Sequence, residues 1–217
     1  MKNLAKSPPV FLRVQKQLGW VSAPVVLLLA CILGSPHLVS PADNPYLTGQ
    51  LLVATPEMSD PRFFQAVIYM VRHDKNGAMG LVINKPIAKG PIADLLKSLG
   101  KDSDGAKGEI ILHYGGPVEP DKGLILHSDD YVLDSTTIVE NGIAVTGDVE
   151  LLRTISLGKG PRERLVMLGH AGWAAGQLEA EIKAGAWFSI AAERALLFGE
   201  DAQSKWEHAM DKRKIGL

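Results

Sequence analysis

The sequence predicts an α+β fold, in which helices pack around a mixed and largely antiparallel sheet. The chain of 217 residues contains 22 glycines and 13 prolines, a content typical of turn-rich folds and not of an all-helical bundle. Two Asn-Gly pairs lie between apolar runs, and such pairs indicate tight hairpins between antiparallel strands. Strand and helix patterns alternate irregularly, whereas a doubly wound parallel sheet requires regular alternation.

Three strands and a short helical turn are expected in the first part of the domain. Apolar runs predict the strands at residues 50–54, 66–71 and 78–83, and Asp60 and Pro61 open the turn. The segment Asp74-Lys75-Asn76-Gly77 predicts a hairpin between the second and third strands, because Asn-Gly tolerates positive φ. Gly80 lies inside the third strand and indicates a bulge or a close backbone approach.

A helix and a surface loop are expected next. A helical stripe of apolar residues lies within residues 91–99 and consists of Ile92, Leu95, Leu96 and Leu99. The loop at residues 101–108 contains an Asp-x-Asp-Gly piece that resembles the start of a calcium loop. The later acidic ligand is missing at the required spacing, so we expect a surface loop without a bound ion.

The remaining pattern predicts further strands and three helices. The strands are expected at residues 109–114, 123–127, 136–139, 143–146, 164–168 and 187–190, with a hairpin at Asn141-Gly142. The helices are expected at residues 148–157, 177–184 and 201–212. Asp148 and Glu150 favour a helix start, because acidic side chains stabilise the positive end of the helix dipole.

The first 45 residues differ from the rest in charge and hydropathy. Residues 1–42 contain four basic residues and no acidic residue, whereas the remainder contains 19 basic and 24 acidic residues. An apolar run, Val25–Leu33, is followed by a helix break at Pro36. This is the layout of a secretory signal, so residues 1–45 are expected to be a signal peptide or membrane anchor, and residues 46–217 the folded domain.

Several fates of this segment remain open. Ser40 and Ala42 suit cleavage after Ala42, whereas Leu28-Leu29-Ala30-Cys31 loosely matches a lipoprotein box with Cys31 lipidated. If it is retained, the uncharged stretch 18–39 is long enough to span a bilayer at roughly 20 residues of helix, and membrane contact is expected only there. These fates place the domain at the inner membrane or in the periplasm. A misplaced start codon would instead leave it in the cytosol.

Familiar catalytic motifs are absent from the sequence. It contains no Walker loop, GxSxG elbow, HExxH pair or dinucleotide GxGxxG. Cys31 is the single cysteine and lies in the apolar segment, which excludes an internal disulfide framework and a cysteine nucleophile in the mature domain. We therefore expect no cofactor. The formal net charge of −1 gives no general reason to bind nucleic acid.

The histidines could assemble an acid–base or metal site. His113 and His127 are expected near the ends of two strands that could pair, and Asp129 follows the second of them. His73 precedes the first hairpin turn. No carboxylate stands at ligand spacing, which favours hydrogen-bonded structural roles. A hydrolase or metal-dependent enzyme that uses His113, His127 and Asp129 remains the alternative function, with Asp130 as a substitute carboxylate.

Three ordered blocks of residues span the expected domain. The first runs from Leu47 to Pro56 and continues through Met58, Asp60, Phe63, His73, Gly77–Gly80 and Asn84; the second is Tyr114–Val118 with Gly123 and Leu126–Ser128; the third is Gly169–Trp173 with Gly176–Glu179, Trp187, Leu197, Phe198, Lys205 and Trp206. Together the blocks resemble the AlgH/YqgE family of bacterial proteins over residues 46–217.

The resemblance implies a compact single domain with a barrel-like sheet and no established enzymatic activity. It also implies a cytosolic location and, for some members, a link to transcriptional regulation. It supplies no catalytic residues. Two features depart from the family pattern: His170 stands where an aromatic residue such as tyrosine is expected, and the basic, apolar N-terminus is additional.

The expected function is that of a non-enzymatic binding or regulatory protein with an unidentified protein or small-molecule partner. The candidate surface is drawn from the three blocks and consists of His73, Asn84, Gly115, Gly116, His127, Ser128, Trp173 and Gln177. Gly115-Gly116-Pro117 either offers backbone N–H groups to an anion or forms a tight turn. The acidic balance after residue 42 and the lack of a recognisable helix-turn-helix argue against direct nucleic-acid binding.

Overall fold

The computed structural model describes residues 45–199 and 201–215, which lie within one compact unit, Pro41–Leu217. The expected cleavage site after Ala42, the lipidation site at Cys31 and the apolar stretch 18–39 lie outside the described residues. Within the described part of the chain, no helix is long and apolar enough to cross a membrane.

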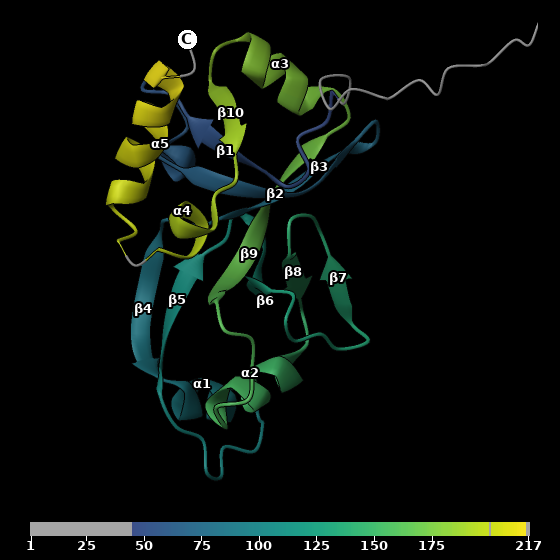
Figure 1. Cartoon of the computed structure of the whole chain (residues 1–217), viewed down its shortest axis with the longest axis vertical. Helices are drawn as coiled ribbons and strands as arrows, with labels where there is room; N and C mark the ends of the chain where they lie inside the picture. Colours follow the sequence, from purple (N-terminus) through teal and green to yellow (C-terminus); the bar gives the residue numbers. More distant parts are fainter. Residues whose placement is uncertain (1–44, 200, 216–217) are drawn as a thin grey trace, which may run out of the picture. The chain divides into compact units, whose positions relative to one another are not determined.

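The described residues form strands, helices and one short 3-10 turn (Figure 1). The strands are β1 Gln50–Ala54, β2 Val67–Asp74, β3 Gly77–Val82, β4 Pro86–Pro91, β5 Glu109–Tyr114, β6 Val118–Ser128, β7 Thr136–Ile138, β8 Ile143–Thr146, β9 Arg164–Ala174 and β10 Trp187–Ala191. The helices are α1 Ile92–Ser98, α2 Val149–Ser156, α3 Gln177–Lys183, α4 Arg194–Phe198 and α5 Ser204–Ile215, and the turn is η2 Pro61–Phe63.

The strands build one curled sheet that forms a half-barrel. Its main path runs β10-β1-β2-β3-β9-β6-β8-β7, and each pair along it is antiparallel. A branch leaves this path at β9, which pairs in parallel with β5, and β5 in turn pairs with β4. The predicted α+β class and the mixed, largely antiparallel sheet are therefore confirmed.

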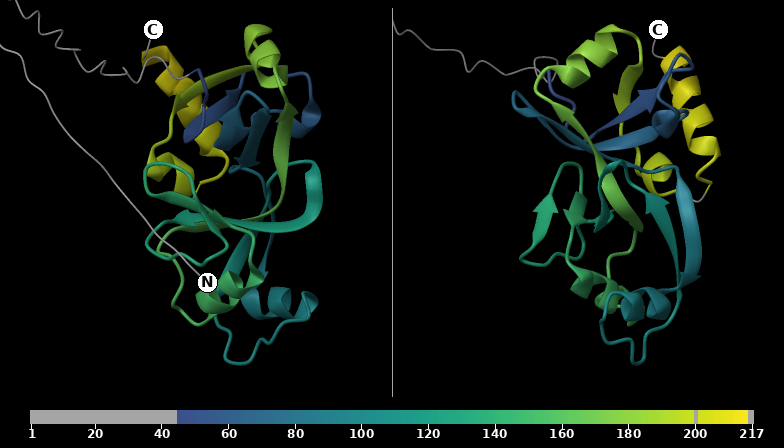
Figure 2. Two further views of the ribbon diagram at one scale, coloured as in Figure 1. Left: turned by 90° about the vertical axis from the view of Figure 1, so that its right-hand side faces the viewer. Right: turned by 180° about the vertical axis from the view of Figure 1, so that it is seen from behind.

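Strand β9 joins the two parts of the sheet. Its C-terminal residues 171–174 pair with β3, whereas its N-terminal residues pair with β5 on one side and β6 on the other. Figure 2 shows β9 running from the strands next to α1 and α2 to the strands next to α3. Gly169 lies between the two paired portions of β9 and has a φ of 69°, so the strand bends there and the sheet curls.

Three apolar clusters fill the space between sheet and helices. The first lies inside the curl, where strand residues such as Val53 and Met167 meet Leu197 of α4 and Ala209 of α5. The second lies on the other face of β1–β3, where α3 places Leu178 against Trp173 and Trp187. The third packs α1 and α2 against β6 and β9. These clusters follow the alternation of side chains in each strand.

Some elements differ from the expectations. Strand β4 and helix α4 were not expected, because β4 is an exposed edge strand rich in Gly, Pro and Lys, and α4 has only five residues. Strands β6 and β9 extend beyond the predicted 123–127 and 164–168. The expected pairing of the strands that carry His113 and His127 is wrong, because β9 lies between β5 and β6.

Both hairpins form where they were expected, but the φ angles of their turn residues differ. In the β7–β8 hairpin, Asn141 and Gly142 have φ angles of 55° and 75°, as Asn-Gly predicts. In the β2–β3 hairpin, Gly77 has a φ of 130°, whereas Asn76 is not among the residues with positive φ. Gly80 was expected to mark a bulge or a close backbone approach. The register shifts on the strand opposite it, between Met70 and Arg72 of β2, and a Cβ on Gly80 would lie 3.1 Å from the carbonyl oxygen of Tyr69.

A close backbone crossing lies at the bend of β9. The N–H of Gly115 donates to the carbonyl of Leu168 at 2.7 Å, and the carbonyl of Gly115 accepts from Val82 at 3.0 Å. A Cβ on Gly116, which has a φ of 149°, would lie 2.1 Å from the backbone carbon of His170. A Cβ on Gly169 would lie 2.4 Å from the carbonyl oxygen of Gly116. Glycines are therefore required on both sides of the crossing.

We expect Gly116→Val to destabilise the domain more than His127→Ala does. The valine would clash with the backbone of β9, whereas His127→Ala removes two buried hydrogen bonds at a cost of about 1–3 kcal/mol. Gly158→Val is the matched control, because Gly158 has a φ of 74° and nothing within 4 Å of its would-be Cβ. Its free energy of unfolding should fall only by the cost of the backbone strain, about 1–3 kcal/mol. If urea unfolding shows that Gly116→Val is at least as stable as these two variants, the close backbone crossing at Gly116 is contradicted.

Candidate functional site

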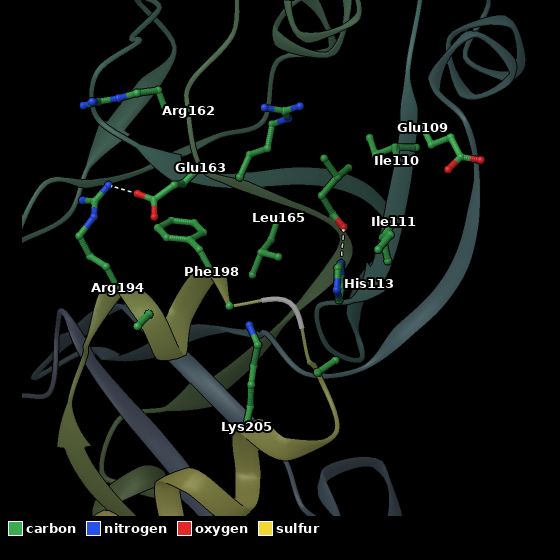
Figure 3. A pocket seen from close by; sticks show the side chains of 15 residues that line it. Glu109, Ile110, Ile111, His113, Arg162, Glu163, Leu165, Arg194, Phe198 and Lys205 are labelled. Carbon is green, nitrogen blue, oxygen red and sulfur yellow. Dashed lines mark hydrogen bonds and ion pairs between the residues drawn. The ribbon is translucent and has the colours of Figure 1, made fainter.

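A cavity of about 670 Å³ lies between β5, the start of β9, α4 and α5 (Figure 3). Its apolar wall comes from Ile111 on β5, Leu165 on β9 and Phe198 on α4. Its charged and titratable side chains are Glu109, His113, Arg162, Glu163, Arg164, Arg194 and Lys205. Ile111 is 44% exposed, so the cavity is open to solvent on the β5 side.

Lys205 is the buried cation of this cavity. It lies on α5, only 3% of its surface is exposed, and its side chain points into the cavity in Figure 3. Nζ donates a hydrogen bond of 2.6 Å to the carbonyl of Leu197, which lies in the last turn of α4. Such carbonyls lack partners within their own helix, so the ammonium group satisfies one of them. Burial lowers the pKa of Lys205 from 10.5 to about 8.

His113 lies on the opposite wall of the same cavity. Its Nδ1 is 3.3 Å from the carbonyl oxygen of Val166, which indicates that Nδ1 carries the proton and donates it. Burial lowers the pKa of His113, and the positive charge of Lys205 acts in the same direction. The imidazole is therefore neutral at pH 7.

The other charges are partly compensated. Arg194 forms an ion pair with Glu163 and lies 5.8 Å from the ring centroid of Phe198. Arg162 pairs with Asp130 at 2.8 Å, and Glu109 pairs with Lys89 at 2.9 Å outside the cavity lining.

Arg164 shifts the balance of the lining towards positive charge. Its guanidinium donates to a backbone carbonyl, that of Pro161. The described lining contains four basic side chains, those of Arg162, Arg164, Arg194 and Lys205, and two carboxylates, those of Glu109 and Glu163. An apolar wall next to this excess suits a small organic anion.

Part of the expected candidate surface lies elsewhere, around α3. The Nε1–H groups of Trp173 and Trp187 both donate to Oε2 of Glu181, at 2.9 and 2.8 Å, and Gln177 donates to Oε1. A second cleft of about 490 Å³ opens beside these side chains. Both tryptophans are buried, with 7% of Trp173 and 3% of Trp187 exposed, so Trp173 is not an open surface residue. Their hydrogen bonds are met within the protein.

His73 and Asn84 support neighbouring backbone. Nδ1 of His73 accepts from the N–H of Leu47, and Nε2 lies 3.1 Å from Oε1 of Glu179 on α3. Asn84 accepts from the N–H of Val67 and donates to the carbonyl of Gln65, whose φ is 53°. Gly115 and Gly116 form the backbone crossing already described, and the N–H of Gly115 donates to the carbonyl of Leu168 there.

The alternative set around His127 is separated from His113 by β9. The ring nitrogens of His127 contact the carbonyl of Ser128 at 2.8 Å and Oγ1 of Thr146 at 2.9 Å, so both are occupied. Ser128 donates to Asp130, which lowers the pKa of that carboxyl.

The structure does not bring the three residues of the alternative together. Asp129 is exposed, and its N–H donates to the carbonyl of Gly142. Within residues 45–199 and 201–215, no three His, Cys, Asp or Glu side chains are grouped so that they could hold a metal ion.

Lys205 belongs to the third block of family-like residues, but the sequence alone did not identify it as a site residue. The signal that could have found it is its position on the last helix. Lys205 lies four residues before Ala209, so the two residues share the buried face of α5. A lysine at such a position needs a partner or a polar cavity.

The fold and this cavity define an α+β half-barrel domain with a cation-lined site. The chain belongs to the AlgH-like family, whose model matches residues 51–217. It is 40% identical over 192 residues to a UPF0301 protein of Afipia carboxidovorans, covering 85% of this chain and 91% of that protein. It is 42% identical over 194 residues to a UPF0301 protein of Methylobacterium nodulans, covering 84% and 91%.

Two solved structures resemble the chain. The AlgH protein of Pseudomonas aeruginosa is 36% identical, with a TM-score of 0.67 over 82% of this chain and 92% of that one. A protein of Corynebacterium diphtheriae is 20% identical, with a TM-score of 0.62 over 78% and 88%, and supports the fold alone. The expected family membership is therefore confirmed. The function of this family is uncharacterised.

Lys205 should make stability depend on pH above neutrality. Its pKa is about 8 in the folded chain, against 10.5 without burial, so between these values the unfolded chain binds more protons and stability rises with pH. We expect the free energy of unfolding of the parent chain, relative to Lys205→Met, to rise by about 1–3 kcal/mol between pH 7.5 and 10. Urea unfolding at several pH values measures this. Lys122→Met, at an exposed position, is the control and should show no such rise.

Proposed function

We propose that this domain is a binding protein that holds a small organic anion in the cavity next to Lys205. The observation that carries the proposal is the buried ammonium group of Lys205, which lies in a solvent-accessible cavity with Arg164 on its wall. The ligand's negative group would lie near these cations. Its apolar body would pack against Phe198, Leu165 and Ile111.

The binding role is non-enzymatic in this proposal. Lys205 and His113 offer one amine and one neutral imidazole, and no carboxylate in the cavity is hydrogen-bonded to either of them among the described residues. A nucleophile–base–orienting-group arrangement, as hydrolases use, is not assembled there.

A regulatory role follows if the ligand changes the fit between α4 and α5. Nζ of Lys205 connects the two helices, since it belongs to α5 and binds the last turn of α4. An anion that draws Nζ away from Leu197 would loosen this connection and alter the surface of both helices for a partner protein. Any link to transcription would then act through a partner, because the acidic balance after residue 42 disfavours direct DNA contact.

Benzoate tests the proposed site, because it combines a carboxylate with an apolar ring. We expect calorimetric titration to show binding that weakens about tenfold, or about 1.4 kcal/mol, in Lys205→Met. Glu163→Gln should strengthen binding a few-fold, since it frees Arg194 from its ion pair. Affinity should fall above pH 8 as Lys205 loses its charge.

The matched control is Arg153→Gln, which removes a cation that pairs with Asp102 outside the cavity. It should bind benzoate as the parent chain does. Equal affinity in Lys205→Met and Arg153→Gln, or no binding by the parent chain, would contradict the proposed site.

We also propose that residues 1–42 direct the domain to or across the inner membrane. The support is the sequence pattern of four basic residues without an acidic one, the apolar run Val25–Leu33 and the small residues Ser40 and Ala42. An exported domain could not control transcription directly, so this proposal favours a partner or ligand outside the cytoplasm.

Cell fractionation with N-terminal sequencing of the mature chain checks the localisation. We expect a periplasmic or membrane-bound chain that starts at Asp43, starts at lipidated Cys31 or keeps the whole segment. A soluble cytoplasmic chain that starts near Tyr46 would show that translation begins later than Met1. A soluble cytoplasmic chain of full length would refute the targeting role of the segment.

A further inference from the structure

The amine of Lys205 has the features of a nucleophile as well as those of a cation. It is almost fully buried, points into an open cavity and is fixed by one hydrogen bond to Leu197. A neutral amine that donates one N–H to a carbonyl keeps its lone pair for another atom. Lys122, by contrast, has 53% of its side chain exposed.

We propose that Lys205 binds its ligand covalently and reversibly, as an imine with a small anion that carries an aldehyde or ketone group. This inference rests on the proposed anion site and names the ligand class that the site would take. Arg164 and Arg194 supply positive charge for the ligand's carboxylate or phosphate, while Phe198 and Leu165 enclose the carbon that reacts.

The protonation states support this chemistry. Burial lowers the pKa of Lys205 to about 8, so a substantial fraction of the amine is neutral near physiological pH and can act as a nucleophile. His113 is neutral for the same reason and adds no further positive charge beside the amine. The guanidinium groups of Arg164 and Arg194 keep their positive charge when Lys205 is neutral, because arginine is not deprotonated in proteins.

The step balances without an oxidant or reductant. The lone pair of Nζ attacks the carbonyl carbon, and the nitrogen loses a proton as the oxygen gains one. The resulting carbinolamine loses water as the C=N bond forms. One amine and one carbonyl compound thus give one imine and one water molecule, and hydrolysis reverses the step. The ligand is released unchanged, which is consistent with a binding role.

Reductive trapping on the full chain tests the proposal. We treat the protein with 4-carboxybenzaldehyde or with benzaldehyde in the presence of cyanoborohydride and map the labelled lysines by peptide mass spectrometry. We expect 4-carboxybenzaldehyde to label Lys205 at least tenfold faster than Lys122, and faster than benzaldehyde labels Lys205. Benzoate should slow the labelling of Lys205 and leave that of Lys122 unchanged.

Two variants test whether the label requires this amine. Lys205→Arg keeps a positive charge at this position but cannot form an imine, so peptide mapping should find no label on residue 205. Lys122→Arg is the matched control and should keep the label on Lys205.

Each failure has a distinct meaning. Labelling of Lys205 no faster than Lys122, in a chain that binds benzoate, would overturn the imine and leave the proposed function in place. Equal labelling of Lys205 by the two aldehydes would overturn the anionic ligand class. A chain that neither binds benzoate nor labels at Lys205 would contradict both proposals. The labelling of the parent chain decides the main point even if a variant does not fold.

Discussion

The rest of the structure depends on the backbone crossing between Gly115–Gly116 and the bend of β9 at Gly169. At this crossing a Cβ would lie within 2.4 Å of the opposing backbone, closer than any side chain allows. The crossing lets β9 pair with β3 beyond the bend and with β5 and β6 before it, so that one strand belongs to both parts of the sheet. The curl that results gives α4 and α5 a concave face to cover, and the cavity lies at the edge of that contact.

The cavity combines two requirements that oppose each other. An apolar wall excludes water and lowers the stability of a buried charge, yet Lys205 is placed there with an α-helical carbonyl as its partner. The cost of this burial is the reason for the low pKa of the amine. Groups that are buried at such a cost are common at binding sites, where they are held in place for a ligand. The burial of Lys205 therefore indicates a binding role and not a contribution to stability.

Local patterns in the sequence predicted much of the fold. The Asn141–Gly142 turn, the helix that begins after Asp148 and the irregularity beside Gly80 were predicted because each depends on nearby residues. The branch through β5 and the exposed strand β4 were not, because their pairing joins residues about 20 to 50 positions apart. The cavity was missed for the same reason. Burial of Lys205 depends on Leu197, on β5 and on β9, and no periodicity in one segment shows that these meet.

The central claim is that the cavity at Lys205, and not the cleft beside α3, is the binding site. Nuclear magnetic resonance of the nitrogen-labelled protein during a benzoate titration tests it most directly, because indole and backbone N–H signals report on each region separately. We expect the backbone signals of Val166, Leu197 and Lys205 to shift with saturation, while the indole signals of Trp173 and Trp187, which donate to Glu181, stay constant. Saturable shifts of those two indoles, with unchanged signals around Lys205, would contradict the account.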